Sequence, residues 1–161
     1  MSSMGEITIQ QATALHADSL LECLRVAFEP YRSAYTKGGY EDTVLTQQSL
    51  LRRLDKMTVL VALEGSGRVA GTIAYKVSDQ AEGHLRGMAV RPDCQGSGLA
   101  DQLLERAEAE LVKENCSRIS LDTTEPLERA MRFYERHGYR RSGKIQDFFG
   151  MPLIEYSKEL R

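Results

Sequence analysis

A glycine-marked corner at residues 95–98 (Gln-Gly-Ser-Gly) has the clearest chemical potential in the chain. It follows a short, moderately apolar stretch at 84–90 that stops at Arg91-Pro92-Asp93, as a strand stops at a turn. After the corner, apolar residues recur at steps of four and predict a helix: Leu99, Leu103, Ala107 and Leu111. A strand that enters a helix through Gly-x-Gly gathers unpaired backbone N–H groups at the positive end of the helix dipole. We therefore expect the corner to bind the anionic group of a phosphorylated ligand.

The corner alone leaves the ligand open, since Gly-Ser-Gly between a strand and a helix can also be only a tight turn. A Rossmann dinucleotide site would have a third glycine where this chain has Asp101. A P-loop would continue with Gly-Lys-Ser/Thr, which does not follow the corner. The two commonest nucleotide-binding motifs are therefore disfavoured.

The composition is that of one globular domain over residues 1–161, with 42% hydrophobic and 27% charged residues. A net charge of −2 offers no basic field for nucleic acid or a membrane surface. The first six residues lack an apolar signal core, and no apolar run approaches the ~20 residues of a membrane span, so we expect a cytoplasmic protein. The three cysteines (Cys23, Cys94 and Cys116) lack metal-ligand spacing, which predicts reduced thiols and no metal site.

Hydrophobic periodicity predicts an α/β fold in the order β-α-α-β-β-β-α-β-α-β-β. Strands are expected at 6–11, 57–63, 68–78, 84–90, 118–122, 139–145 and 153–160. Helices are expected at 18–28, 43–54, 99–111 and 126–137, the last with Thr124 as its N-cap. The segment 31–43, with paired glycines and three tyrosines, is too broken for a long helix. Hairpins and a parallel crossover over 84–122 then give a mixed, mostly antiparallel sheet of about seven strands flanked by about four helices.

Two motifs in this frame resemble the GNAT superfamily of N-acetyltransferases. Residues 90–100 (VRPDCQGSGLA) resemble its acyl-CoA loop, [Arg/Gln]-x-x-Gly-x-[Gly/Ala], which Gln95, Gly98 and Ala100 meet here. Residues 130–139 (AMRFYERHGY) resemble its second signature, a helix ending Ala-x-x-x-Tyr-Glu-x-x-Gly-[Phe/Tyr]. The order of elements matches as well, so the resemblance covers nearly the whole chain and implies a single-domain GNAT-like fold with acetyl-CoA as cosubstrate.

The resemblance also implies how acetyl-CoA would bind. Its pyrophosphate would accept hydrogen bonds from the backbone of the corner, formed by Gln95, Gly96, Ser97, Gly98, Leu99 and Ala100. Its pantetheine arm would pair with the backbone of the preceding strand at Met88, Ala89 and Val90. The arm would enter where the sheet splays between the strands at 84–90 and 118–122.

The chemistry implied is direct attack of a primary amine on the thioester in a ternary complex, with a proton returned to the leaving thiolate. Tyr134 holds the tyrosine position of the second signature, which implies a hydroxyl near the sulfur and a role as general acid. The alternative is that Tyr134 only packs a helix face with Ala130 and Met131. Leu127 stands where the family often has an asparagine that contacts the cofactor.

The base is left between two residues and water. A lysine-like amine of pKa ~10.4 is only about 0.04% neutral at pH 7, so a proton must be removed. Many family members have a glutamate where this chain has His84, whose ordinary pKa of ~6.5 suits a proton relay. By strand alternation His84 should share a face with Arg86 and Met88. Glu82 is the rival, and both could be merely solvated residues at a strand start.

The acceptor site, in this family, lies between the first two helices and the loop joining the last two strands. Here those segments offer carboxylates and aromatic rings that suit a cationic amine: Glu29, Tyr31, Tyr35 and Phe148. We expect a small amine or amino-acid-like acceptor, and the sequence leaves open a monomer or a homodimer. The alternative function is an acyl-CoA-binding sensor without turnover. Cys94, beside the corner, is read as a packing residue and not as a nucleophile.

Overall fold

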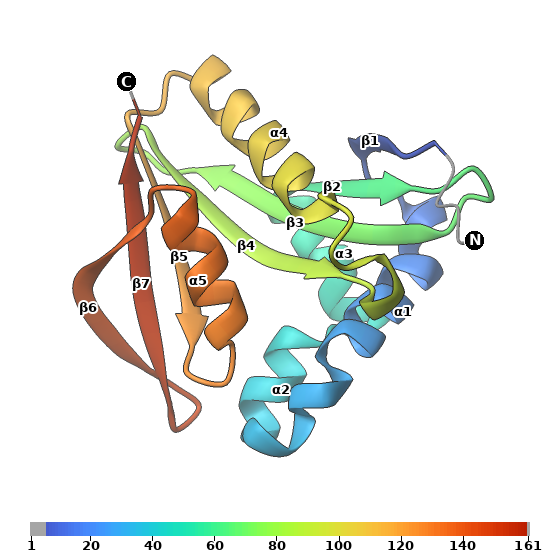
Figure 1. Ribbon diagram of the computed structural model, residues 1–161, viewed down its shortest axis with the longest axis horizontal. Coiled ribbons are helices and arrows are strands. Elements are labelled where there is room, and N and C mark those ends of the chain that lie inside the picture. Colours follow the sequence, from blue (N-terminus) through green and yellow to red (C-terminus); the bar gives the residue numbers. More distant parts are fainter. Residues whose placement is uncertain (1–5, 161) are drawn as a thin grey trace.

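The structure is a computed structural model that describes residues 6–160. Over that range one sheet has seven strands in the order β1-β2-β3-β4-β5-β7-β6 (Figure 1). The strands are β1 (Thr8–Gln11), β2 (Thr58–Leu63), β3 (Val69–Val77), β4 (Glu82–Val90), β5 (Arg118–Thr124), β6 (Arg140–Phe148) and β7 (Met151–Glu159). The α-helices are α1 (Ala17–Phe28), α2 (Lys37–Thr43), α3 (Gln47–Lys56), α4 (Leu99–Lys113) and α5 (Glu128–Arg136). Short 3-10 turns are η1 (Ala14–His16), η2 (Glu29–Ala34) and η3 (Pro92–Cys94).

The predicted fold class is confirmed: a single-domain α/β arrangement on a mostly antiparallel sheet. β4 and β5 form the one parallel pair among the described residues, and α4 is the crossover between them. Every other neighbouring pair of strands is antiparallel. The β2–β3 hairpin has its predicted turn at residues 64–67. The β6–β7 connection is shorter than predicted, because the two strands extend to Phe148 and from Met151 and leave only residues 149–150 between them.

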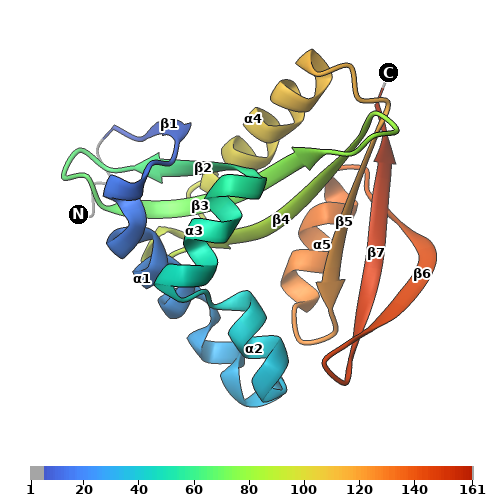
Figure 2. The same cartoon turned by 180° about the vertical axis from the view of Figure 1, so that it is seen from behind.

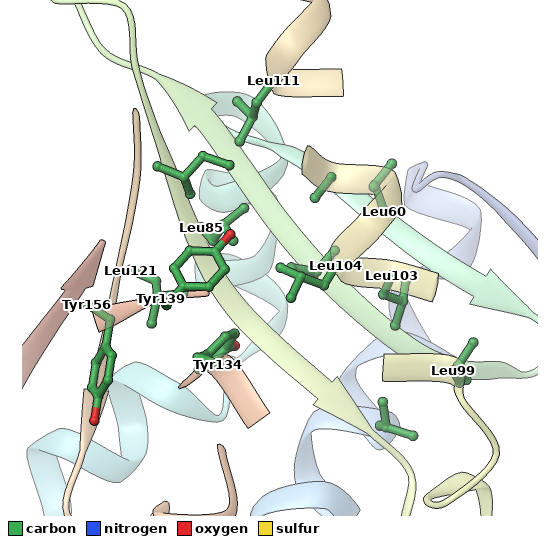
Figure 3. Packing of buried hydrophobic residues seen from close by; sticks show 14 of the residues in the cluster. Leu60, Leu85, Leu99, Leu103, Leu104, Leu111, Leu121, Tyr134, Tyr139 and Tyr156 are labelled. Carbon is green, nitrogen blue, oxygen red and sulfur yellow. The ribbon is translucent and has the colours of Figure 1, made fainter. Parts of the chain in front are cut away.

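Helices cover both faces of the sheet. Figure 1 shows α4 and α5 on one face, and Figure 2 shows α1 and α3 on the other. The apolar residues predicted at steps of four along α4 are fully buried. Figure 3 shows leucines of α4 packed with leucines and tyrosines from the strands and α5. A second cluster, which includes Leu24 of α1 and Leu50 of α3, fills the opposite face. The two cores hold the sheet rigid from both sides, so its strand ends can position functional groups.

The helices differ from the prediction between residues 37 and 47, after α1. The segment 37–43 forms the short helix α2, because the Thr36 side chain caps Gly39 N–H at 3.1 Å. Gly38 is required there, since a Cβ would lie 2.6 Å from the ring of Phe149. α3 begins at Gln47 and not at residue 43, because Thr46 forms a reciprocal capping box with Ser49.

Thr124 is not the N-cap of the last helix. It still pairs with Leu153 in the β5–β7 ladder, which carries the strand past its predicted end. α5 starts at Glu128, with Leu127 at the N-cap and no side-chain cap. The Thr124 side chain is thereby left in the wall of the central cavity.

Candidate active site

The sheet opens between β4 and β5, as the family resemblance implied. The two strands pair from Glu82 with Arg118 to Leu85 with Leu121 and then diverge (Figure 1). A cavity of about 640 Å³ lies in this opening, and its walls come from β4, β5, α5 and η2. Its lining residues come both from α5, on the face that α4 and α5 cover, and from α1 and α3, which cover the other face.

The glycine corner forms one end of the cavity. Gly96 and Gly98 have φ angles of +79° and +84°, which only glycine adopts without strain. The first helical hydrogen bond of α4 is donated by Gln102 to the Gly98 carbonyl at 3.1 Å. Within residues 6–160, the backbone N–H groups of residues 96–101 donate to no protein acceptor. These donors and the α4 dipole make the anion site that the sequence predicted chemically available.

The side chains of the corner are fixed by their own contacts. The Gln95 amide donates to the Val90 carbonyl at 3.2 Å and accepts from the Arg129 guanidinium at 3.2 Å. The Ser97 hydroxyl donates to the Cys94 carbonyl at 2.6 Å, and the Leu99 side chain is in the core. Of the cofactor-binding residues predicted, these line the cavity: Met88, Ala89, Val90, Gln95, Gly96, Gly98, Ala100 and Tyr134. Ser97 and Leu99 do not, so only their backbone N–H groups are available to a ligand.

Three arginines of α5 also line this end of the cavity. They are Arg129, Arg132 and Arg136, and sequence reasoning missed them. Their spacing of three and four on a helix was the signal, since it places them on one side. The nearby Asp101 carboxylate accepts from His137 at 2.6 Å, which leaves it less available to repel an anion. The positive electrostatic potential at the corner therefore favours phosphate groups.

Tyr134 lies in α5 between the core and the cavity. The residue is 7% exposed, and its ring meets those of Phe133 and Tyr139 edge-on; Figure 3 shows Tyr134 beside Tyr139. Burial raises the pKa of Tyr134 well above its ordinary value, because the phenolate would be poorly solvated. It is therefore a neutral phenol, able to donate a proton or a hydrogen bond. Tyr134 therefore packs against the core and also lines the cavity.

His84 faces the cavity from β4 opposite Ser120. Its Nδ1 lies 3.0 Å from the Ser120 hydroxyl and its Nε2 lies 3.7 Å from an Asp122 oxygen. Burial lowers the pKa of His84, and the Asp122 charge partly opposes this effect. Burial also raises the pKa of Asp122. At neutral pH, His84 is a neutral imidazole beside a carboxylate, which is the state of a competent proton acceptor.

Glu82 lies elsewhere. Its carboxylate pairs with Arg118 at 3.0 Å, in the part of the sheet where β4 and β5 are still joined. It does not line the cavity. The geometry thus brings His84, and not Glu82, to the cavity wall.

A bulge at Gly87 breaks the alternation of β4. Ala74 of β3 pairs with Arg86, whereas Thr72 pairs with Ala89, so β4 carries one extra residue there. Gly87 has a φ of +69°, and Met88 turns to the core beneath α4. The expectation that His84, Arg86 and Met88 share one face is therefore wrong for Met88. An isolated glycine within a strand pattern was the available signal.

The other end of the cavity is aromatic, as predicted, but less acidic. Tyr31, Tyr35 and Phe148 line it. Glu29 does not: its side chain is 54% exposed and lies 3.6 Å from Arg32. Burial raises the pKa of Tyr35. The sole Asp or Glu of η2 and α2 in the wall is Asp42, among the residues described, and it pairs with Arg86.

Several polar groups of this end were missed by the sequence reasoning. They are Arg53, Arg86, Asp122, Thr123 and Thr124. They come from three separate elements, α3, β4 and β5, and meet only through the register of β4 with β5 and the packing of α3. Thr123 and Thr124 have buried hydroxyls without a hydrogen-bond partner in the described part of the chain. A buried hydroxyl without a partner costs about 1–3 kcal/mol, so these groups suit a ligand.

Two further residues support the predicted roles. The Cys94 thiol donates to Asp93 at 3.3 Å, and burial raises its pKa to about 11. The neighbouring carboxylates of Asp93 and Glu64 also disfavour the thiolate, so Cys94 stays a protonated thiol, as expected of a packing residue. Leu127 provides an apolar wall where the resembled family often has asparagine.

Residues 6–160 contain neither a metal-binding cluster nor a helix suited to a membrane span. No group of three or more His, Cys, Asp or Glu residues there could hold a metal ion. None of the helices there has the length and hydropathy needed to span a membrane.

Comparison with known proteins gives one family. The model of the acetyltransferase (GNAT) family matches residues 19–139. A GNAT-family acetyltransferase from Staphylococcus aureus Mu50 is 18% identical, with a TM-score of 0.78 over 97% of this chain and 100% of that one. PaiA N-acetyltransferase from Thermoplasma acidophilum, solved with coenzyme A, is 19% identical, with a TM-score of 0.79 over 97% and 100%. The ribosomal-protein-S18-alanine N-acetyltransferase from Escherichia coli is 18% identical, with a TM-score of 0.77 over 96% and 94%.

Proposed function

Because this chain belongs to the acetyltransferase (GNAT) family, we propose that it transfers an acetyl group from acetyl-CoA to a primary amine by direct attack in a ternary complex. One observation carries the proposal. A single cavity passes through the sheet, with the anion corner and Tyr134 at one face and His84 at the other. Two substrates can therefore meet at the divergence of β4 and β5 from opposite sides.

The corner suits the pyrophosphate of acetyl-CoA. Six consecutive backbone N–H groups, from residue 96 to 101, lack protein acceptors within residues 6–160. The α5 arginines add positive charge beside them. Beyond Leu85, β4 has lost β5 as a neighbour, which leaves its edge open to an extended pantetheine arm.

The amine is expected to lose its proton to His84. Burial keeps the imidazole neutral, and the Asp122 carboxylate stabilises the imidazolium once the proton arrives. The Ser120 hydroxyl at Nδ1 holds the ring so that Nε2 is directed toward Asp122. Glu82, already paired with Arg118, is not expected to contribute.

Tyr134 is expected to donate a proton to the departing sulfur. A thiol of pKa ~8.5 and a phenol of pKa ~10 are well matched in water. Burial raises the pKa of Tyr134, so the phenol holds its proton until the thiolate develops beside it.

The experiment that tests the function offers acetyl-CoA and a panel of amines, amino acids and peptides, and measures release of free thiol. An enzyme releases thiol in proportion to one acceptor and forms the acetylated amine, which mass spectrometry detects. An acyl-CoA sensor, the alternative function, would bind acetyl-CoA in calorimetry and release thiol with none of the panel. A protein that binds neither acetyl-CoA nor CoA would contradict both functions.

Substitution of Gly98 by alanine is expected to weaken acetyl-CoA binding by about tenfold or more, because it strains the corner that directs the N–H groups. The matched control is Gly67→Ala in the β2–β3 turn. Both glycines have positive φ, of +84° and +92°, and a Cβ on either would meet no protein atom within 4 Å. Each variant should lose about 1–2 kcal/mol of stability. Calorimetry with acetyl-CoA then separates them, and equal affinities in the two variants would exclude the corner as the phosphate site.

A further inference from the structure

Arg53 is a cation of the cavity that the proposed mechanism does not use. It projects from α3 under the β4 bulge, where a Cβ on Gly87 would lie 2.7 Å from its Nη1. The absence of a side chain at Gly87 therefore makes room for the guanidinium. Arg53 is half-buried and lines the cavity. Among residues 6–160, no carboxylate lies within ion-pair distance of it and no group accepts a hydrogen bond from its guanidinium.

The neighbours of Arg53 leave one positive charge without a counterion. Arg86 lies close enough to repel it, and the nearest anion, Asp42, is paired with Arg86. Burial lowers the pKa of Arg53 to about 10, with Arg86 as the second cause. Two guanidinium groups thus share one carboxylate in a partly desolvated wall. A buried cation without a partner is costly, and a bound anion would remove that cost.

The missing anion belongs to the acceptor and not to acetyl-CoA. The corner and the α5 arginines already serve phosphates at the far face of the sheet. Arg53 comes from α3, which covers the opposite face, and Asp42 comes from α2, which lies beside α1 on that side (Figure 2). A planar guanidinium fits a carboxylate through two parallel hydrogen bonds.

The position of the anion relative to the base limits the size of the acceptor. His84 and Arg86 lie two residues apart on one face of β4, before the bulge, which corresponds to roughly 7 Å. Arg53 lies beside Arg86. An acceptor whose amine reaches His84 and whose anion reaches the arginines must carry both groups a few bonds apart. We propose that the acceptor is a free small amino acid, with its carboxylate bound by Arg53 and its amine directed at His84.

This proposal rests on the proposed function, and its test compares matched acceptors. Thiol release is measured with glycine, alanine, aspartate and glutamate, each against its α-carboxamide. An α-carboxamide has the less basic amine, so chemistry alone would favour it. A preference for the acid therefore reports binding of the carboxylate. Further arms use spermidine, phosphoethanolamine, and a short amidated peptide with N-terminal aspartate.

The acid is expected to exceed its carboxamide by about tenfold or more in kcat/KM, mainly through KM. Arg53→Gln should bring the ratio of acid to carboxamide close to one, and Arg53→Lys should retain part of the preference. The matched control is Arg52→Gln, the exposed neighbour on α3, which should keep the wild-type ratio. Circular dichroism of each variant checks the fold.

The negative outcomes distinguish failure of the amino-acid proposal from failure of acetyl transfer itself. If carboxamides, spermidine, phosphoethanolamine or the acidic peptide are better acceptors than every free amino acid, acetyl transfer stands and the amino-acid proposal falls. If no acceptor releases thiol, acetyl transfer falls, and thermal stabilisation of the CoA-bound protein by the same amino acids decides the proposal. Stabilisation that Arg53→Gln abolishes and Arg52→Gln keeps would support the carboxylate site. Stabilisation that is absent, or equal in both variants, would overturn it.

Discussion

Tyr134→Phe is expected to lower kcat by about 10²–10⁴-fold and to change the affinity for acetyl-CoA little. The hydroxyl is the only group removed, and the ring keeps its edge-on contacts with Phe133 and Tyr139. Burial raises the pKa of Tyr134, so in the wild type the proton is present throughout the physiological range. Its loss should therefore affect departure of the thiolate and not assembly of the complex. Steady-state kinetics and calorimetry with acetyl-CoA measure the two effects separately.

A neighbouring tyrosine provides the control for this prediction. Tyr139 is equally buried, but its hydroxyl donates to Glu108 at 2.7 Å and does not line the cavity. Tyr139→Phe should cost about 1 kcal/mol of stability through the lost hydrogen bond and leave kcat unchanged. Turnover by Tyr134→Phe at the wild-type rate would remove Tyr134 from the chemistry and leave it a packing role.

The features predicted well are those that local sequence determines. The stripe of α4 has helical periodicity and is buried, and the Gly-x-Gly corner has the left-handed φ angles that its glycines allow. β4 and β5 were found from short apolar runs, and their divergence followed from the resemblance to a known family. Each of these depends on residues close in the sequence or on motifs of fixed spacing.

The features that were missed depend on contacts between distant segments. Asp122 reaches His84 only because Ser120 lies opposite His84 in the β4–β5 register. Arg53 reaches the cavity only because the Gly87 bulge leaves space for it. Neither contact has a periodic pattern in the sequence, and a one-residue change of register would remove the first.

Glu29 illustrates the opposite error. Its residue type suited a cationic acceptor, but Arg32 lies one turn later and forms an ion pair with it in solvent. An acidic residue with a basic residue three positions on is common on solvated surfaces. The polar wall of the cavity is instead built by Arg86 and Arg53 with the carboxylates of Asp42 and Asp122, and among the described residues Arg53 is the member without an ion pair. Of the two acceptors expected from the sequence, a small amine and an amino-acid-like molecule, the unpaired Arg53 supports the proposal of the second.

His84→Gln is expected to lower kcat/KM at pH 7 by about 10²-fold and to change the pH dependence. In the wild type, burial holds the pKa of His84 below its ordinary 6.5, so activity should rise as pH passes upward through that lower value. Above it the imidazole is neutral and can accept the proton of the amine. Glutamine keeps a polar side chain opposite Ser120 but cannot take up a proton. The acidic limb should therefore disappear, and the only rise left should follow ionisation of the amine itself.

Asp122→Asn tests the same pair by removing the negative charge that stabilises protonated His84. The Asp122 charge raises the pKa of His84 against the effect of burial, so its removal should move the acidic limb to lower pH. Activity on the plateau should also fall, because the imidazolium loses its counterion. Glu82→Gln, at the pair with Arg118, should leave the profile in place. Profiles of kcat/KM from pH 5 to 9 for the three variants test this assignment, and an acidic limb that persists in His84→Gln would transfer the base role to another group or to water.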